Sequence, residues 1–373
     1  MNLPPSPNPC NGNGNRAIAA LILLAILPAL PTLVAPFFGD DYIHLERLGE
    51  IRSGSLSSAF RTWVLRSDDS GAWWSPQGRT FGYFRPLMSL ALYLDHSLWG
   101  GIPFGYHLTN LGLHVLTTLL LYGIARKILG DALPPLVAAG LFAIHPCHTE
   151  AIWWIAARSD LLAGLLYVAA VLAHVKSRPI RCGSVHLVGL LLLLFALALL
   201  SKEMAITLPA VLLLYNLLEP GDEGLWRRLL VPGLAAGVGL LYLGLRTIHV
   251  GPMEIPPHPF AHGPGDPDML QHLAAALILY MADLTLFVPP DPVVTFPFWI
   301  RHPLLLLALG ALSGAVLVFL FRTSRGCRVR LLALGWIGIS MSPVLLLSVG
   351  ERFLYLPSVG YCLLIGSVVP RSW

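Results

Sequence analysis

The sequence predicts an all-α integral membrane protein with about ten transmembrane helices. Of its 373 residues, 55% are hydrophobic and 12% are charged, whereas a soluble globular chain carries about 25% charged residues. The mean hydropathy is +0.70. The apolar residues also gather into runs of roughly the length that crosses a bilayer, at 17–38, 105–125, 132–146, 161–175, 185–200, 204–218, 229–248, 303–321, 331–349 and 353–369.

The N-terminal residues 1–16 are rich in Pro, Asn and Gly, so we expect a disordered cytoplasmic tail. The first apolar run, 17–38, contains three prolines, and no cleavage site of small residues follows it. We therefore interpret this run as a retained, proline-kinked helix rather than as a signal peptide. Residues 17–370 are expected to form one polytopic membrane domain.

Two long outer loops are expected, at 39–104 and 249–302. In the first loop, His44–Arg52 is amphipathic and is expected to lie on the membrane interface. Pro86–Leu98 is apolar but too short for a span, which favours a surface or re-entrant helix. In the second loop, Leu270–Phe287 is apolar and allows two interpretations. It is either a surface helix that covers a site or an additional membrane element, which would change the number of spans.

The basic residues predict the orientation, because connections rich in Lys and Arg stay in the cytoplasm. With a cytoplasmic N-terminus, the short outer connections carry only Arg158, Lys202 and Arg352. Ten spans then place both termini in the cytoplasm. The inner connections carry Arg126 and Lys127; Lys176, Arg178 and Arg181; Arg227 and Arg228; and Arg322, Arg325, Arg328 and Arg330.

The conspicuous polar motifs fall on the outer face in this topology, although the basic residues alone define the orientation. A purely structural membrane protein has no need of such a one-sided distribution, so it predicts a site at the outer membrane surface. The motifs are Asp40-Asp41, His145 to Glu150, Arg158 with Asp160, Ser201-Lys202-Glu203, and Glu351 to Tyr355. The tryptophans are interpreted as an interfacial belt, at Trp63, Trp73, Trp74, Trp153, Trp154 and Trp299.

The charged groups of this face each allow two interpretations. Arg158, Lys202 and Arg352 together could hold an anionic group such as a lipid phosphate. Alternatively, each could anchor its helix at the interface or pair with a neighbouring acid. One of the acids could deprotonate a hydroxyl group as a general base, or each could pair with a cation. The acids are Asp40, Asp41, Glu150, Asp160, Glu203 and Glu351.

His145, His148 and Glu150 raise the question of a metal, because His and carboxylate groups bind zinc. Their HxxHxE spacing is not a zincin motif, and Pro146 breaks the helix between the histidines, which favours helix termination and capping. We therefore predict no metal ligands, and a divalent cation as cofactor stays open. The five cysteines show no paired spacing, so no disulfide framework is expected, at Cys10, Cys147, Cys182, Cys327 and Cys362.

Several of these stretches resemble the tetratricopeptide-repeat-containing O-mannosyltransferases and their bacterial relatives. Residues 145–162, HPCHTEAIWWIAARSDLL, are similar to the family signature HPxHTEAVxWIxxRxDLL. Phe84–Leu87, Gly105–His114, Ser201–Glu203 and Arg352–Ser358 also match, and all the matches run in the order of the family. The match at 145–162 is specific, whereas Ser-Lys-Glu alone is weak.

The resemblance implies the GT-C glycosyltransferase fold. It implies transfer of a sugar, mannose or another hexose, from a polyprenyl-phosphate carrier to a hydroxyl of an acceptor protein or glycan at the non-cytoplasmic face, by one inverting displacement. It places the catalytic base at Asp41 or Asp40 and the donor phosphate on Arg85, Arg158, Lys202 and Arg352. The substrate-binding residues implied are His107, Asn110, His145, His148, Glu150, Asp160, Glu203 and Tyr355.

The sequence has no tetratricopeptide repeats before it stops at Trp373, so acceptor recognition by such repeats is not expected of this chain. Compact loops and the lack of repeats favour a bacterial inner membrane. The bilayer, the lipid-linked sugar and the acceptor are the expected partners, and no nucleic acid is. Two alternatives stay open. One is a transporter or flippase of a lipid-linked or small polar solute, which would place charges near the bilayer midplane. The other is a non-catalytic relative that binds lipid phosphate.

Overall fold

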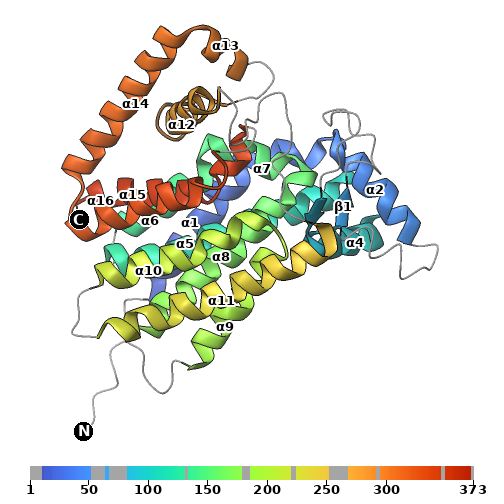
Figure 1. Ribbon diagram of the computed structural model, residues 1–373, viewed down its shortest axis with the longest axis horizontal. Coiled ribbons are helices and arrows are strands. Elements are labelled where there is room, and N and C mark those ends of the chain that lie inside the picture. Colours follow the sequence, from blue (N-terminus) through green and yellow to red (C-terminus); the bar gives the residue numbers. More distant parts are fainter. Residues whose placement is uncertain are drawn as a thin grey trace.

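The computed structural model describes residues 11–51, 64–66, 82–130, 133–178, 185–219, 224–251, 268–290, 295–345 and 349–370. Long apolar helices form the body of the protein, and α5, α8, α10 and α11 run side by side across Figure 1. The helices of the body are α1 (Asn11–Ile26), α5 (Pro103–Leu129), α6 (Leu133–Ile144), α8 (Arg158–Ser177), α9 (Val185–Leu199), α10 (Leu208–Leu218), α11 (Leu225–Val250), α14 (Pro303–Thr323), α15 (Cys327–Met341) and α16 (Pro357–Val368).

The first helix starts earlier than the sequence predicts. Helix α1 begins at Asn11, so residues 11–16 are helical instead of disordered, and the rest of the predicted tail lies outside the described residues. Polar residues can extend a helix once an apolar run has formed it, because each added residue gains a hydrogen bond. After Ile26 the chain continues as the 3₁₀ helix η1 (Leu27–Val34). The prolines here lack the N–H that an α-helix needs, which explains the change of helix type.

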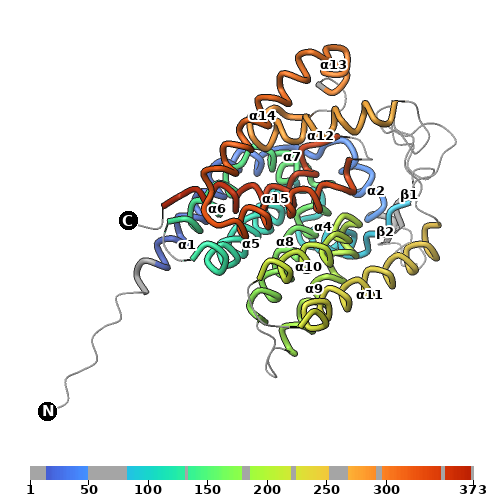
Figure 2. The backbone as a smooth tube through the Cα atoms, turned by 60° about the vertical axis from the view of Figure 1, so that its left-hand side comes forward, coloured from blue at the N-terminus to red at the C-terminus, as the bar shows by residue number. Residues whose placement is uncertain are grey.

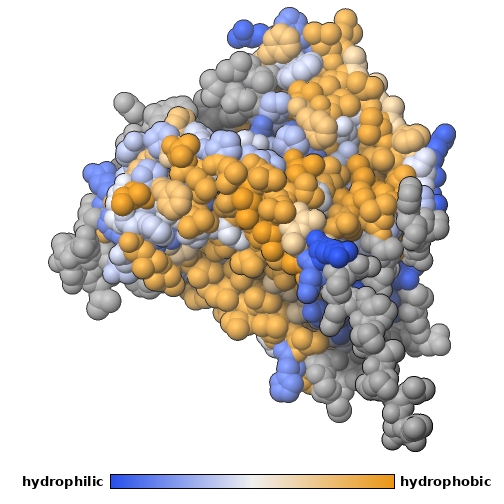
Figure 3. All heavy atoms as spheres, turned by 180° about the vertical axis from the view of Figure 1, so that it is seen from behind, coloured by the Kyte–Doolittle hydropathy of each residue, from blue (hydrophilic) through white to orange (hydrophobic). Residues whose placement is uncertain are grey.

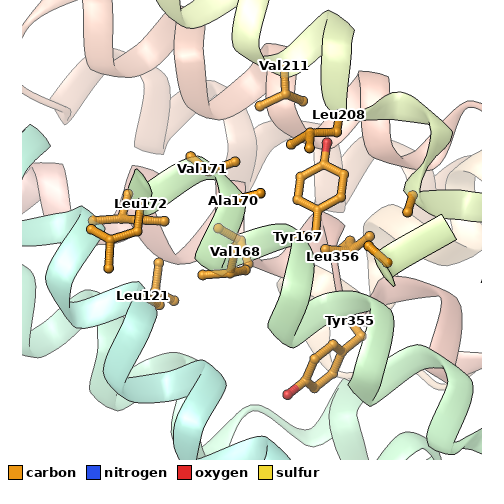
Figure 4. Packing of buried hydrophobic residues seen from close by; sticks show 14 of the residues in the cluster. Leu121, Tyr167, Val168, Ala170, Val171, Leu172, Leu208, Val211, Tyr355 and Leu356 are labelled. Atoms are coloured by element: carbon orange, nitrogen blue, oxygen red, sulfur yellow. The ribbon is translucent and has the colours of Figure 1, made fainter. Parts of the chain in front are cut away.

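Side chains from α5, α8 and α10 meet in the core at the centre of the bundle (Figure 4). Leu121, Val168 and Leu208 are fully buried there. Small residues let other helices approach closely, which strengthens packing inside a membrane. A Cβ atom added to Gly366 of α16 would lie 2.8 Å from the carbonyl oxygen of Pro134. Helix α16 therefore packs its backbone directly on α6.

The outer surface of the body is apolar over large areas. Leu304 is 80% exposed and Leu240 is 70% exposed, and Figure 3 shows apolar side chains across most of the rear face. Patches of this extent are stable only against lipid or another protein. Six of the described helices are long and apolar enough to cross a membrane, and four further apolar helices are shorter. The predicted all-α integral membrane fold is thus confirmed, while the number of ten spans stays a prediction.

Helix α12 (Met269–Leu286) covers the stretch that the sequence left open. By length and composition it qualifies as a membrane span. Figure 1 views it nearly end-on, however, whereas α5, α8 and α11 run across the same view. Its last turn lies against the His145 motif, because the Leu284 carbonyl oxygen accepts a hydrogen bond from His145 Nε2 at 3.2 Å. The arrangement agrees with a helix that lies across one end of the bundle and covers it.

The connections of the bundle separate into two ends. At one end, which we call the arginine end, the Arg325 N–H donates to the Ser367 carbonyl, and Gly366 lies against Pro134. The arginine end therefore joins the α5–α6 and α14–α15 connections. An ion pair between Arg328 and Glu219 adds the α10–α11 connection. Arg325 and Arg328, two of the basic residues that the sequence assigns to inner connections, thus lie at this end, while the topology itself stays a prediction.

Short elements gather at the opposite end, which we call the site end. Figure 2 shows α2, β1, β2 and α4 there, beside the last turns of α11. Strands β1 and β2 pair antiparallel with Val64 opposite Phe84. The elements of the site end are α2 (Asp40–Ile51), β1 (Val64–Arg66), β2 (Gly82–Phe84), α4 (Pro86–Trp99), η2 (Pro146–His148), α7 (Thr149–Trp153), η3 (Ile155–Ala157), η5 (Glu203–Thr207) and η6 (Glu351–Leu354). Helix α13 (Thr295–Arg301) joins α12 to α14.

Helices α2 and α4 fall where the sequence predicts interfacial helices. Residues 52–63 and 67–81 of the first predicted outer loop, with Trp63, Trp73 and Trp74, lie outside the described residues. On α4, Leu94 and Leu98 are exposed and Leu92 is buried. A helix that is apolar on its outer face and packed on its inner face suits a membrane interface.

Candidate functional site

Asp40 and Asp41 begin helix α2, where the free N–H groups of a helix start favour acidic residues. Asp41 is only 2% exposed. Its Oδ2 accepts the Phe38 N–H at 2.9 Å, and its Oδ1 accepts the Ala156 N–H at 2.7 Å. The carboxylate thereby ties the end of the first span to the turn before α8. Asp40 is half-buried and so is the more accessible of the two.

Burial raises the pKa of Asp41 to about 6, against the two backbone hydrogen bonds, which lower it. Desolvation disfavours the charged form of any carboxylate that leaves water. A carboxyl group with a pKa near neutrality can take up a proton and release it again at physiological pH. The position and the pKa both fit the base that the sequence assigns to this motif.

Three cations of the site end each pair with a carboxylate from a distant part of the chain. The Nε and Nη2 of Arg85 donate to Glu203 Oε2, at 3.1 and 2.9 Å. Lys202 Nζ donates to both oxygens of Asp160, at 2.6 and 2.5 Å. Arg352 pairs with Glu150 through its guanidinium and its backbone N–H.

Aromatic rings connect these pairs into one cluster. The ring of Phe353 lies between Lys202 Nζ and the Arg352 guanidinium, each 4.7 Å from its centre. Arg352 also lies 4.8 Å from the ring of Trp154, whose Nε1 donates to the Phe38 carbonyl at 3.3 Å. The cluster thus reaches the segment that leads into Asp40. We call these six charged residues, Arg85, Glu150, Asp160, Lys202, Glu203 and Arg352, the ionic cluster.

The side chains of the ionic cluster differ in how much of their surface is exposed. The side chains of Lys202 and Asp160 are 6% and 4% exposed, whereas those of Arg352 and Glu150 are 25% and 24% exposed. Arg85 lies between these extremes at 15%. Burial lowers the pKa of Lys202 to about 8, and the Asp160 carboxylate opposes that shift. Arg85 and Arg352 are therefore the cations that a ligand can reach, with Lys202 behind them.

Arg158 lies apart from the ionic cluster, in the scaffold beneath it. It is fully buried and forms an ion pair of 2.6 Å with Asp95 of α4. Its Nε donates to Asn110 Oδ1 at 2.8 Å, and its Nη2 donates to the Tyr106 carbonyl at 2.8 Å. The guanidinium thus joins α4, α5 and α8 through its contacts with protein groups.

Asn110 and His107 serve the same scaffold. The Asn110 amide donates to the carbonyls of Ile152 and Trp154, at 3.3 and 3.4 Å. It thus holds the turn that carries Glu150 and Trp154. His107 Nε2 lies 3.1 Å from the Ala35 carbonyl, and the ring is 1% exposed.

The two motif histidines are also engaged within the protein. His145 Nδ1 accepts the Cys147 N–H at 3.3 Å while its Nε2 bonds α12. His148 Nε2 lies 2.8 Å from Ser358 Oγ. Tyr355 is 1% exposed, and its hydroxyl lies 3.1 Å from His114 Nδ1. The contact between His148 and Ser358 holds η2 against α16. His145, His148 and Tyr355 are thus engaged within the protein and lie outside the accessible part of the ionic cluster.

No group of three or more His, Cys, Asp or Glu residues that could hold a metal ion occurs among the described residues. The His145 and His148 rings lie 5.8 Å apart, but each histidine bonds a group of the protein and Glu150 pairs with Arg352. The sequence also missed four side chains at the site end. Asp95 pairs with Arg158, Tyr83 lies 4.3 Å from the Arg85 guanidinium, and Tyr280 and Asp283 of α12 face the cluster. The sequence did contain one signal for this region, because Asp283 is an acidic residue within the apolar stretch 270–287.

Comparison with known proteins finds relatives that are glycosyltransferases by name. No family model matches the chain. The chain is 34% identical over 207 residues to the protein O-mannosyl-transferase Tmtc1 of Drosophila melanogaster, covering 54% of this chain and 23% of that protein. Human protein O-mannosyl-transferase TMTC2 is 32% identical over 204 residues, covering 53% of this chain and 24% of that protein. The chain spans about a quarter of the length of these relatives.

Among solved structures, the fold is similar to that of ArnT from Cupriavidus metallidurans bound to undecaprenyl phosphate. The TM-score is 0.51 at 17% sequence identity, and the match covers 98% of this chain and 61% of that chain. The fold and the one-ended site therefore define an integral membrane protein whose fold is similar to that of ArnT. Its sequence is similar to the protein O-mannosyl-transferases over about half of its length, so the predicted resemblance is confirmed.

Proposed function

We propose that this protein transfers a sugar, mannose or another hexose, from a polyprenyl-phosphate carrier to a hydroxyl group on an acceptor protein. One observation carries the proposal. In a GT-C fold, the ionic cluster and the Asp40–Asp41 pair lie together at one end of the bundle, connected through Trp154 and Phe38. The names of the relatives, protein O-mannosyl-transferases, agree with it.

Arg85 and Arg352 are the proposed contacts of the donor phosphate, with Lys202 adding charge from below. Both arginines pair with a carboxylate, and both keep part of the side chain exposed. Guanidinium groups bind phosphate oxygens with two parallel hydrogen bonds. The electrostatic attraction is strong at the edge of a low-dielectric bundle. Arg158, which the sequence grouped with these cations, is proposed as a positioning residue.

The proposed reaction is one displacement at the anomeric carbon. The acceptor oxygen forms a bond to that carbon while the bond from the carbon to the phosphate oxygen breaks, and the lipid phosphate leaves with the electron pair. Asp40 or Asp41 takes the proton of the acceptor hydroxyl. Preorganised cations stabilise the charge that develops on the leaving phosphate. A single displacement inverts the configuration of the sugar.

The site end is proposed to face the non-cytoplasmic side, in a bacterial inner membrane. The arginine end gathers Arg325 and Arg328 with other basic residues, and basic connections stay in the cytoplasm. Arg328 pairs with Glu219 at the arginine end, whereas Asp41 and Arg352 belong to the site end. A divalent cation as cofactor is part of the test below.

The test is sugar transfer in reconstituted vesicles. The purified protein receives radiolabelled polyprenyl-phosphate mannose, or the glucose analogue, with a membrane-protein extract as acceptor and with or without a chelator. We expect transfer to stop in the variants Asp40→Asn and Asp41→Asn together, and to continue in Glu46→Gln, which changes an exposed acid on the same helix. Donor binding without transfer by the wild type would favour the non-catalytic lipid-phosphate-binding alternative. Full activity of the double variant would refute the assignment of the base.

A further inference from the structure

Helix α12 presents two polar side chains to the site end that the proposed chemistry does not use. Tyr280 is fully buried and Asp283 is 2% exposed. They lie three residues apart, so they occupy the same face of the helix. Tyr280 Oη and Asp283 Oδ2 are both without a hydrogen-bond partner, within the part of the chain that the structure describes. Such groups are few in folded proteins, because burial without a hydrogen bond destabilises the fold.

The surroundings of the two side chains place them beside the ionic cluster. Arg352 and Glu150 both act electrostatically on Tyr280, and the Gly350 N–H lies close to the Tyr280 hydroxyl without a hydrogen bond of good geometry. The charges that act on Asp283 are Glu351 and Glu150. Asp283 thus lacks a cation, while Arg352 lies on the same side of the helix. The unpaired face of α12 is next to the cation proposed to hold the donor phosphate.

We propose that Tyr280 and Asp283 form a subsite for the hydroxyl groups of the donor sugar, an inference that rests on the proposed function. A sugar carries adjacent hydroxyls that both donate and accept hydrogen bonds, so one ring can satisfy a carboxylate oxygen and a phenol together. A phosphate or sulfate would be repelled by Asp283 with Glu150 and Glu351 beside it. A polyprenyl chain could satisfy neither group. The phosphate on Arg352 and the sugar on α12 are then neighbouring parts of one ligand.

The geometry of α12 supports a built site rather than an accident of packing. His145 Nε2 holds the Leu284 carbonyl, and Phe287, which ends the helix, has a positive φ of 58°. A bulky residue is uncommon in this backbone region and is strained there. The Phe287 ring packs 5.3 Å from the His145 ring. The scaffold therefore holds this end of α12 in place although its inner polar face is unsatisfied.

The test compares lipids that differ only in the sugar they carry. Affinities for polyprenyl phosphate and for polyprenyl-phosphate mannose, glucose and an amino-sugar analogue are measured on the purified full chain. The variants are Tyr280→Phe, which removes the phenol hydroxyl, and Asp283→Asn, which keeps the shape but replaces one acceptor oxygen by a donor and removes the charge. Thr285→Val is the matched control, because the Thr285 hydroxyl on the same helix bonds only the Met281 carbonyl.

The wild type is expected to bind the best sugar-bearing lipid more tightly than polyprenyl phosphate. Each variant should reduce that preference roughly five- to tenfold, the worth of one hydrogen bond, while its affinity for polyprenyl phosphate and its unfolding temperature do not fall. An unchanged preference in both variants would overturn the subsite. If the wild type preferred only the lipid that carries the amino sugar, the assignment of Tyr280 and Asp283 to sugar hydroxyl groups would be wrong. A wild type that binds none of the lipids would overturn the proposed function itself.

Discussion

The pair of Arg158 and Asp95 offers the sharpest test of how the site is built. Arg158 is fully buried, and the side chain of Asp95 is 7% exposed. The variant Asp95→Asn keeps the shape but leaves the guanidinium with neutral acceptors only. Removing one partner of a buried ion pair costs about 3–5 kcal/mol. We expect the variant to unfold at a temperature several degrees below the wild type in detergent.

The double variant Asp95→Leu with Arg158→Met extends the test to function. Apolar replacement of a whole buried pair is often neutral, so we expect it to recover at least half of the loss caused by Asp95→Asn, as a double-mutant cycle would show. Because we propose that Arg158 is a positioning residue, the double variant should still bind polyprenyl phosphate. Recovered stability with no lipid binding would show that Arg158 contacts the phosphate, against our reasoning.

Three further outcomes follow from the structure. The kcat/KM of transfer should be bell-shaped, falling below about pH 6 as Asp41 gains its proton and falling above about pH 8 as Lys202 loses its charge. Arg352→Gln should weaken binding of polyprenyl phosphate roughly tenfold or more, as loss of a charge-assisted contact predicts, measured by equilibrium binding. Gly366→Ala should lower the unfolding temperature by overpacking, whereas Gly338→Ala, with open space around it, should not.

Matched controls make the first two of these outcomes specific. Arg328→Gln removes a cation that is 49% exposed at the arginine end, so it should leave lipid binding unchanged while Arg352→Gln reduces it. Equal losses in both variants would point to general attraction of an anionic lipid. For the pH profile, Asp41→Asn should remove the acidic limb if Asp41 is the base. A limb that persists near pH 6 in that variant would move the role to Asp40.

The sequence predicted the class of fold because composition and apolar runs alone require a membrane. It also predicted that the polar motifs share one face. It did not predict the partners within the ionic cluster. Lys202 and Arg352 were considered beside Glu203 and Glu351, their neighbours in sequence. Adjacent residues point in different directions, and the structure pairs Lys202 with Asp160, 42 residues away.

The other two ion pairs of the cluster join residues that lie even farther apart in the sequence. Arg85 meets Glu203 across 118 residues, and Arg352 meets Glu150 across 202 residues. Such contacts depend on which helices lie side by side, and a single sequence carries no signal for that. Trp154 was interpreted as an interfacial residue for the same reason, although its ring packs on Arg352. The position of α12 was left open because its length and composition suit both a span and a surface helix.

The most specific sequence match, residues 145–162, supplies mostly scaffold. His145 and His148 hold α12 and α16, and Arg158 joins three helices. Only Glu150 and Asp160 of this stretch enter the ionic cluster, and each does so by pairing with a cation from another segment. The chemistry of the site thus depends on residues outside the strongest match, Arg85 and Arg352 with the Asp40–Asp41 pair. Variants within 145–162 should therefore act first on stability, and variants of the outer residues should act first on lipid binding and transfer.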